Sequence, residues 1–144
     1  MREIKYIVVH CTATPPDTTI ESIAHYWKYN LGWKNPGYHY IIKRNGDIIA
    51  INPEERISNG VKGYNKNAVH ISYIGGVDEN NVAIDNRTQA QIESMYSKLV
   101  ALSKKYPAAT ILGHRDFPDV TKLCPSFDVK EWLENYSPGL RKAA

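Results

Sequence analysis

The chain has 144 residues, a formal net charge of +3 at pH 7 and two cysteines. This length is typical of one domain built around one hydrophobic core, so we expect a single domain over residues 1–144. Lysine and arginine are scattered along the sequence, which gives little support to a nucleic-acid partner. The purely apolar runs extend over only a few residues, far fewer than the roughly 20 that insert into a membrane as a helix.

The N-terminus gives an expectation about localisation. The segment Met1–Val9 carries charged residues and then becomes strand-like. It lacks the apolar stretch and the small-residue cleavage site of a signal peptide, so we expect synthesis in the cytoplasm. If the substrate lies outside the cytoplasm, either another system releases or exports the chain, or a leader has been removed. The small size and single core favour a monomer.

The first third of the chain predicts a strand followed by a helix. The run Tyr6–His10 is apolar and rich in β-branched residues, which predicts a buried strand that ends at His10. Thr18 and Glu21 have the spacing of a capping box. Apolar residues then repeat at helical spacing, so we expect a helix that ends near Gly32.

The next segments predict a hairpin and a further strand. Asn45-Gly46 is a strong turn signal between the runs 37–42 and 47–51, which we therefore expect to pair as antiparallel strands. The stretch 59–67 is interpreted as a loop, and 69–74 as a further strand.

The last third predicts two helices around a short strand. The apolar residues of 88–106 repeat every three or four positions, as in a long amphipathic helix. The strand 110–113 leads into His114, and Asp128 with Glu131 offers a capping box for a final helix. The order β-α-β-β-β-α-β-α predicts an α/β fold with a central mixed β-sheet flanked by helices.

Two histidines stand at the C-terminal ends of predicted strands. His10 and His114 reach the same sheet edge if their strands are neighbours, and Cys124 follows on a Pro-containing loop long enough to return to His114. Two imidazoles and one thiolate are a good set of zinc ligands, and three protein ligands leave the fourth position for water. Zinc lowers the pKa of such a water to about 7, so an open position indicates catalysis.

Each of these residues also has a plainer interpretation. A histidine at a strand end is more often an ordinary polar residue than a ligand. Cys124 alone could be a small buried hydrophobic residue, or it could form a disulfide with Cys11 in an oxidising compartment. Because side chains alternate along a strand, Cys11 points to the face opposite His10. We therefore interpret Cys11 as a packing residue and Cys124 as a ligand.

Several blocks of sequence together resemble one family. The sequence is similar to the N-acetylmuramoyl-L-alanine amidases of the phage-lysozyme type, relatives of the peptidoglycan recognition proteins, from about Ile4 to about Tyr136. The blocks occur in the family's order and are His10-Cys11-Thr12-Ala13-Thr14, Gly32-Trp33, Gly37-Tyr38-His39-Tyr40-Ile41-Ile42-Lys43-Arg44-Asn45-Gly46, Lys62-Gly63-Tyr64-Asn65 and Lys122-Leu123-Cys124-Pro125-Ser126-Phe127-Asp128.

The resemblance implies a fold, a reaction and a set of site residues. The implied reaction is the hydrolysis of the amide that joins the lactyl group of N-acetylmuramic acid to L-alanine in bacterial peptidoglycan. The implied cofactor is Zn²⁺, bound by His10, His114 and Cys124. Tyr38 and Lys122 are implied to lie beside the metal, where a hydroxyl or an ammonium can stabilise the oxyanion of the tetrahedral intermediate. Which of the two protonates the leaving amine stays open.

Weaker expectations concern the substrate cleft. Lys62 and Asn65 are candidates for contacts with the peptidoglycan. The sequence departs from the family at Gly60, where the phage enzymes often have a histidine two positions before the Lys-Gly-Tyr-Asn block. That departure concerns the substrate contacts and cleft lining rather than the metal ligands.

The remaining polar residues near the motifs are expected to have supporting roles. We expect His25 to be exposed on a helix, His39 to be structural or adjacent to the ligands, and His70 to be packed or hydrogen-bonded within its strand. Asp116 is expected either to orient His114 or to be a solvated acid.

Two other functions compete with a zinc amidase. A relative that loses the thiolate becomes a non-catalytic peptidoglycan-binding module, but this chain keeps both Cys124 and Lys122. A cysteine hydrolase that pairs Cys124 with a histidine is the second alternative. It predicts inhibition by thiol alkylation and indifference to chelators, whereas a zinc enzyme is inhibited by chelators and rescued by zinc.

Overall fold

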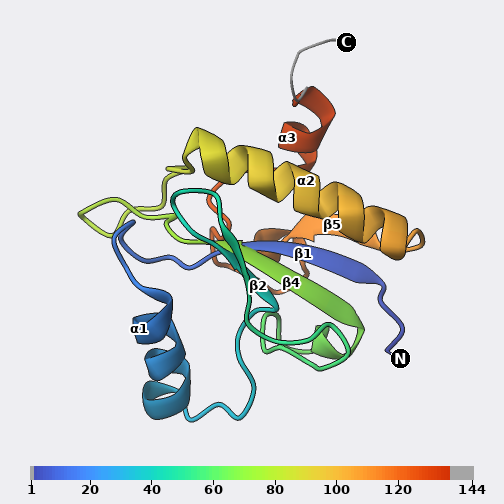
Figure 1. The fold of residues 1–144 in the computed structure, drawn as a ribbon, viewed down its shortest axis with the longest axis horizontal. Coiled ribbons are helices and arrows are strands. Elements are labelled where there is room, and N and C mark those ends of the chain that lie inside the picture. The colour runs from blue at the N-terminus through green and yellow to red at the C-terminus, as the bar shows by residue number, and fades with distance from the viewer. Residues whose placement is uncertain (1, 137–144) are drawn as a thin grey trace.

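The structure is a computed structural model that describes residues 2–136, so the ends of the expected domain 1–144 lie outside the described residues. Its five-stranded sheet has the order β3-β2-β4-β1-β5. β1 lies between β4 and β5 and runs parallel to both, β2 runs parallel to β4, and only β3 is antiparallel, paired with β2. The sheet is therefore mixed, as the sequence predicted (Figure 1).

The strands agree with the sequence-based expectations to within a few residues. Strand β2 is shorter than expected, since 37–39 precede the ladder, and the turn spans five residues with Gly46 at a φ of +94°. The bounds are β1 Tyr6–Cys11, β2 Tyr40–Ile42, β3 Ile48–Ala50, β4 Ala68–Tyr73 and β5 Thr110–Gly113.

The helices also lie where the periodicity predicts them. The expected N-terminal helix is a regular turn that continues as a π-helix, and short 3-10 turns precede β4 and follow β5. The bounds are α1 Ile20–His25, the π-helix η1 Tyr26–Asn30, η2 Asn65–Asn67, α2 Gln89–Lys105, η3 His114–Asp116 and α3 Val129–Asn135.

The N-cap of α1 is Thr19, one residue later than the Thr18 that the sequence pattern predicts. The backbone N–H of Thr18 donates to the carbonyl of Pro15, which holds Thr18 in the preceding turn. Thr19 is extended instead, and its hydroxyl accepts from the N–H of Ser22 over 3.1 Å. For α3, Asp128 caps the helix as expected by accepting from the N–H of Glu131.

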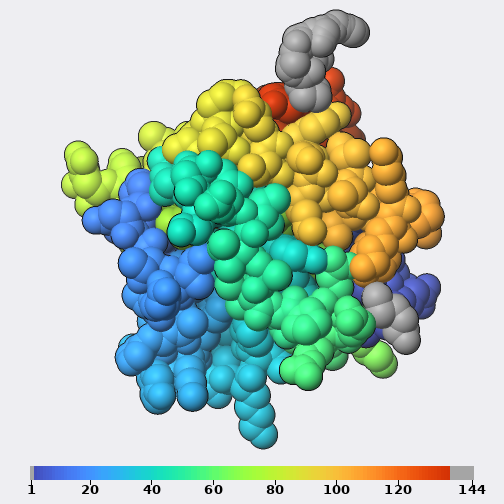
Figure 2. Space-filling model, viewed as in Figure 1, coloured from blue at the N-terminus to red at the C-terminus, as the bar shows by residue number. Residues whose placement is uncertain are grey.

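Helices cover the two faces of the sheet unequally. Helix α2 lies along one face, where Met95, Leu99 and Leu102 pack against the apolar side chains of β1 and β4. On the opposite face, Trp27 of η1 packs with Ile41 and other residues of a second cluster. The segments around β2 and β3, coloured teal in Figure 2, separate α1 from α2 on the visible face.

Candidate metal centre

His10 and His114 meet where two neighbouring strands end. Val9 of β1 is in register with Gly113 of β5, so the next residue of each strand stands at the same carboxyl edge. The two imidazole centroids are 4.8 Å apart. His10 is buried, whereas His114 is half-buried as the first residue of η3. The expected juxtaposition of the two histidines is therefore present in the structure.

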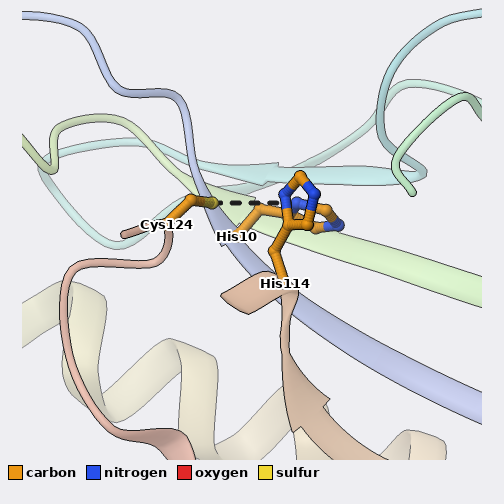
Figure 3. Close-up of side chains that lie close together, drawn as sticks. All are labelled: His10, His114 and Cys124. Carbon is orange, nitrogen blue, oxygen red and sulfur yellow. Dashed lines mark hydrogen bonds between the residues drawn. The ribbon is translucent and has the colours of Figure 1, made fainter. Parts of the chain in front are cut away.

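Cys124 completes the cluster from the loop that precedes α3. Its Sγ lies 3.9 Å from Nδ1 of His10, and the three potential ligand atoms all lie within 4.8 Å of one another (Figure 3). Tetrahedral zinc with its usual bond lengths places such atoms about 3.3 to 3.6 Å apart. A contraction of at most about 1.5 Å at each pair would suffice, so the donor set and its spacing fit a zinc ion.

The protonation of the cluster suits a metal. Burial, followed by the neighbouring His70 and His114, lowers the pKa of His10 well below its ordinary value. Burial and then the charge of Lys122 lower the pKa of His114 to about 4. Both rings are therefore neutral near pH 7, the form in which imidazole binds a metal.

In contrast to the two histidines, Cys124 is protonated near pH 7 before a metal binds, although a metal requires the thiolate. Its hydrogen bond with the Cys11 thiol, followed by burial, raises the pKa of Cys124 well above its usual value. A metal binds the thiolate and displaces this proton. The backbone N–H of Cys11 already donates to the sulfur over 3.2 Å, which stabilises the thiolate. Cys11 itself is buried with Ile7 and Val9 in the core, as its expected packing role requires, and neither cysteine forms a disulfide.

Tyr38 and Lys122 both border the cluster. The ring of Tyr38 lies 5.0 Å from that of His10, and its hydroxyl donates to the carbonyl of Cys11 over 3.2 Å. Burial raises the pKa of Tyr38, so its hydroxyl stays protonated. Lys122 is exposed, and its ammonium is close enough to His114 to lower the pKa of that ring.

An open cleft leads to these side chains. A pocket of about 160 Å³ lies directly over the three potential ligands, and it adjoins a cleft of about 690 Å³. The larger cleft is bordered by the loop 59–65 on one side and by 118–122 on the other. Both hollows share Trp33, Asn59, Gly60, His114 and Lys122. Trp33 was part of a recognised motif but had no predicted role, and the structure places it in the cleft wall.

The two weaker candidates for substrate contacts, Lys62 and Asn65, both line the larger cleft, but only the Asn65 side chain has its oxygen occupied by hydrogen bonds to the protein. Lys62 is exposed. The side-chain oxygen of Asn65 instead accepts hydrogen bonds from the backbone N–H groups of Gly60 and Val61, over 3.0 and 2.7 Å. It is also 2.9 Å from Nε2 of His70. The Asn65 oxygen is therefore engaged in holding the loop.

The other polar candidates take supporting positions. His25 is exposed, as expected. His39 and His70 are fully buried, and Nδ1 of His70 lies 2.8 Å from Nε2 of His10. The exposed carboxylate of Asp116 accepts from the backbone N–H of Gly113 over 2.8 Å. Asp116 is therefore a solvated acid, the second of the two roles suggested by the sequence, and it also holds the turn after β5.

Comparison with known proteins places the chain in a family. The sequence model of the family described as N-acetylmuramoyl-L-alanine amidase matches residues 1–127. The chain belongs to this family. It therefore hydrolyses the amide bond between N-acetylmuramic acid and L-alanine in peptidoglycan. The amidase is 39% identical over 129 residues to the endolysin of Escherichia phage T7, which covers 89% of this chain and 84% of that protein.

Solved structures resemble the amidase along most of its length. The N-acetylmuramoyl-L-alanine amidase LysC from Clostridium intestinale has a TM-score of 0.75 and 26% identity, covering 88% of this chain and 79% of that one. The peptidoglycan recognition protein PGRP-SA of Drosophila also has a TM-score of 0.75, with 14% identity and coverage of 94% and 80%. The second likeness shows the shared fold alone. No helix within residues 2–136 combines the length and apolarity needed to cross a membrane.

Proposed function

We propose that the amidase is a zinc enzyme that cuts the cell wall, with the metal held by His10, His114 and Cys124. The observation that carries this proposal is the convergence of three potential ligand atoms, from three separate segments, within 4.8 Å of one another at the floor of an open cleft. Zinc bound there would polarise the substrate carbonyl and supply an acidified water.

The side chains beside the cluster would take complementary parts in the reaction. Attack on the amide carbonyl creates negative charge on its oxygen, and a nearby donor lowers the barrier by binding that charge. Lys122 is the better candidate, because its exposed ammonium is free to turn into the cleft. The hydroxyl of Tyr38 already donates to the carbonyl of Cys11. In this position Tyr38 would hold the backbone at Cys11. It could donate to the substrate only after breaking its hydrogen bond with that carbonyl.

The cleft has the dimensions of a site for an extended polymer. Its volume of about 690 Å³ lies in the range of ligand-binding clefts, and its walls offer Trp33 and Lys62 to a glycan strand with its stem peptide. By analogy with the phage endolysin, the amidase would lyse or remodel the bacterial wall after release or export by another system. We expect it to act as a monomer.

Digestion of purified peptidoglycan tests the proposal. The soluble products would be analysed by mass spectrometry before chelator treatment, after it, and after zinc is restored. Stem peptides that begin with L-alanine, lost with the chelator and regained with zinc, would support a zinc amidase. Release that persists in chelator but stops after thiol alkylation would instead support a cysteine hydrolase. Zinc binding without cleavage would leave a peptidoglycan-binding module.

A further inference from the structure

His70 is a buried histidine on β4 that contacts a proposed zinc ligand. Nδ1 of His70 lies 2.8 Å from Nε2 of His10, which is a hydrogen-bonding distance. The two ring centroids are 4.9 Å apart. His10 faces Cys124 with its other nitrogen, Nδ1. The position of the proton shared by His10 and His70 therefore decides whether the metal-facing nitrogen of His10 has a free lone pair.

Asn65 determines where that proton lies. Its side-chain atom Oδ1 receives two backbone N–H groups, from Gly60 and Val61, so this atom must be the oxygen rather than the nitrogen of the amide. The same oxygen lies 2.9 Å from Nε2 of His70. Since an amide oxygen only accepts, Nε2 of His70 must carry the hydrogen.

The direction of the remaining hydrogen bond follows. A neutral imidazole has one N–H, so a hydrogen on Nε2 of His70 leaves a lone pair on its Nδ1. That lone pair accepts from Nε2–H of His10, and His10 in turn keeps a lone pair on Nδ1. Nδ1 is the His10 nitrogen that lies 3.9 Å from the sulfur of Cys124.

We infer that Asn65 and His70 form a hydrogen-bonded chain that holds His10 in the Nε2–H tautomer and presents its Nδ1 to the metal. Both are positioning residues, because they act through His10 and are not among the three potential ligands themselves. This inference rests on the proposed zinc site. It also assigns Asn65 a role other than the substrate contact expected from the sequence. Partners of this kind typically change metal affinity by about 10- to 100-fold when they are removed.

Two neighbours, His39 and Gly60, restrict the space around the His70 ring. The ring of His39 stacks on it with an interplanar angle of 8° and a centroid distance of 5.9 Å. His39 is itself fixed, since its Nδ1 accepts from the backbone N–H of His70 and its Nε2 donates to the carbonyl of Arg56. Gly60 also lies close to the ring, since a Cβ atom at this position would be 2.3 Å from Nδ1 of His70. The absence of a side chain at Gly60 is therefore what gives the His70 ring its space.

Two substitutions of His70 separate its hydrogen bond from its packing. His70→Phe keeps a ring but removes the acceptor, whereas His70→Asn places an amide oxygen close to the position of Nδ1. Zinc affinity would be measured by competition with a chromogenic chelator, and thermal unfolding would establish that each variant folds. We expect about 10- to 100-fold weaker zinc binding for His70→Phe and substantial recovery for His70→Asn. Folded His70→Phe protein with the parent's zinc affinity would overturn the inference.

Nitrogen-15 NMR of the unsubstituted, metal-free protein tests the tautomer without any variant. We expect the hydrogen on Nε2 in both His10 and His70, and a hydrogen on Nδ1 of His10 would overturn the inference. This readout also separates two failures. A parent protein that binds no zinc would contradict the proposed function, while the NMR result would still decide whether the chain from Asn65 orders the two rings.

Discussion

The sulfur of Cys124 accepts a hydrogen bond from the backbone N–H of Cys11 over 3.2 Å, whereas the Cys11 side chain packs into the hydrophobic core. The two cysteines are thus close in space but differ in surroundings. Cys124 faces His10 and the floor of the cleft, and Cys11 lies among apolar side chains of β1. Cys124 would be essential both as a metal ligand and as a thiol nucleophile. A substitution that tests its role must therefore remove one of these functions and keep the other.

Replacement of Cys124 by aspartate distinguishes a ligand from a nucleophile. A carboxylate is an acceptable zinc ligand, but it cannot act as a thiol nucleophile. We expect Cys124→Asp to retain measurable, chelator-sensitive amidase activity, and Cys124→Ser to lose at least about 100-fold, in keeping with weakened metal binding. Release of stem peptides and zinc content would be measured for both. Equal inactivity of two folded, zinc-containing variants would contradict the ligand role.

Lys122→Met should lower turnover without emptying the metal site. The ammonium of Lys122 borders the pocket over the proposed ligands and is the proposed donor to the oxyanion. Loss of one such donor costs on the order of 100- to 1,000-fold in kcat. Lys62→Met is the matched control, because Lys62 is also exposed in the cleft wall but lies away from the pocket over the ligands. A comparable loss of kcat in both variants, or loss of bound zinc in Lys122→Met, would count against the assigned role.

The sequence predicted the elements and the three potential ligands because their signals are local. The apolar β-branched run before His10 and the short strand before His114 can each be recognised from a few residues. The contact between His10 and His114 depends on the pairing of β1 with β5. This pairing joins distant parts of the chain, and the sequence pattern alone does not predict it. The family resemblance implied the same ligand set, and the parallel register of Val9 with Gly113 explains why the two histidines meet.

The supporting contacts could not be predicted because they depend on register and on backbone groups. Alternation places His70 on a face of β4, but only the structure shows that this face adjoins His10. The sequence suggests Asn65 as a substrate contact, yet its oxygen accepts from two backbone N–H groups, and such groups leave no signal in the sequence. Similarly, Thr18 and Thr19 are adjacent candidates for a cap, and the carbonyl of Pro15 decides between them.

The close approach of Gly60 and His70 predicts a strongly non-additive pair of substitutions. Gly60→Ala would place a methyl group 2.3 Å from Nδ1 of His70, so the ring or the loop would have to shift, which would disturb the hydrogen bond between His70 and His10. We expect Gly60→Ala to weaken zinc binding and destabilise the fold, by about 1 to 3 kcal/mol as is typical of overpacking. In a His70→Ala background the added methyl group should reduce zinc affinity and stability much less, because the imidazole ring with which it clashes is absent. Chelator competition and urea unfolding of all four proteins measure the coupling, and additive effects would contradict the steric relationship.

A separate buried acid ties the loop after β3 to the end of α2. One oxygen of Glu54 accepts from the hydroxyl of Tyr106 over 2.6 Å and from the ammonium of Lys105 over 3.0 Å, and the hydroxyl of Tyr40 donates to the other. Burial alone would raise the pKa of Glu54, but these hydrogen bonds outweigh it and lower the pKa to about 2. The carbonyl of Arg56, two residues further along the loop, holds His39.

The lowered pKa of Glu54 predicts acid sensitivity in a defined range. A carboxylate whose pKa is lower in the folded state than in the unfolded state stabilises the fold above its usual pKa of 4.5, and that contribution disappears as the pH falls toward 2. We expect the metal-free parent to exceed Glu54→Gln in free energy of unfolding by on the order of 1 to 2 kcal/mol at pH 6, after allowance for solvent screening. The difference should shrink steadily between about pH 4.5 and pH 2. Urea unfolding of both proteins across this range measures it, with other acids cancelling in the comparison. A difference that stays constant down to pH 2 would show that the Glu54 carboxylate does not carry this part of the stability.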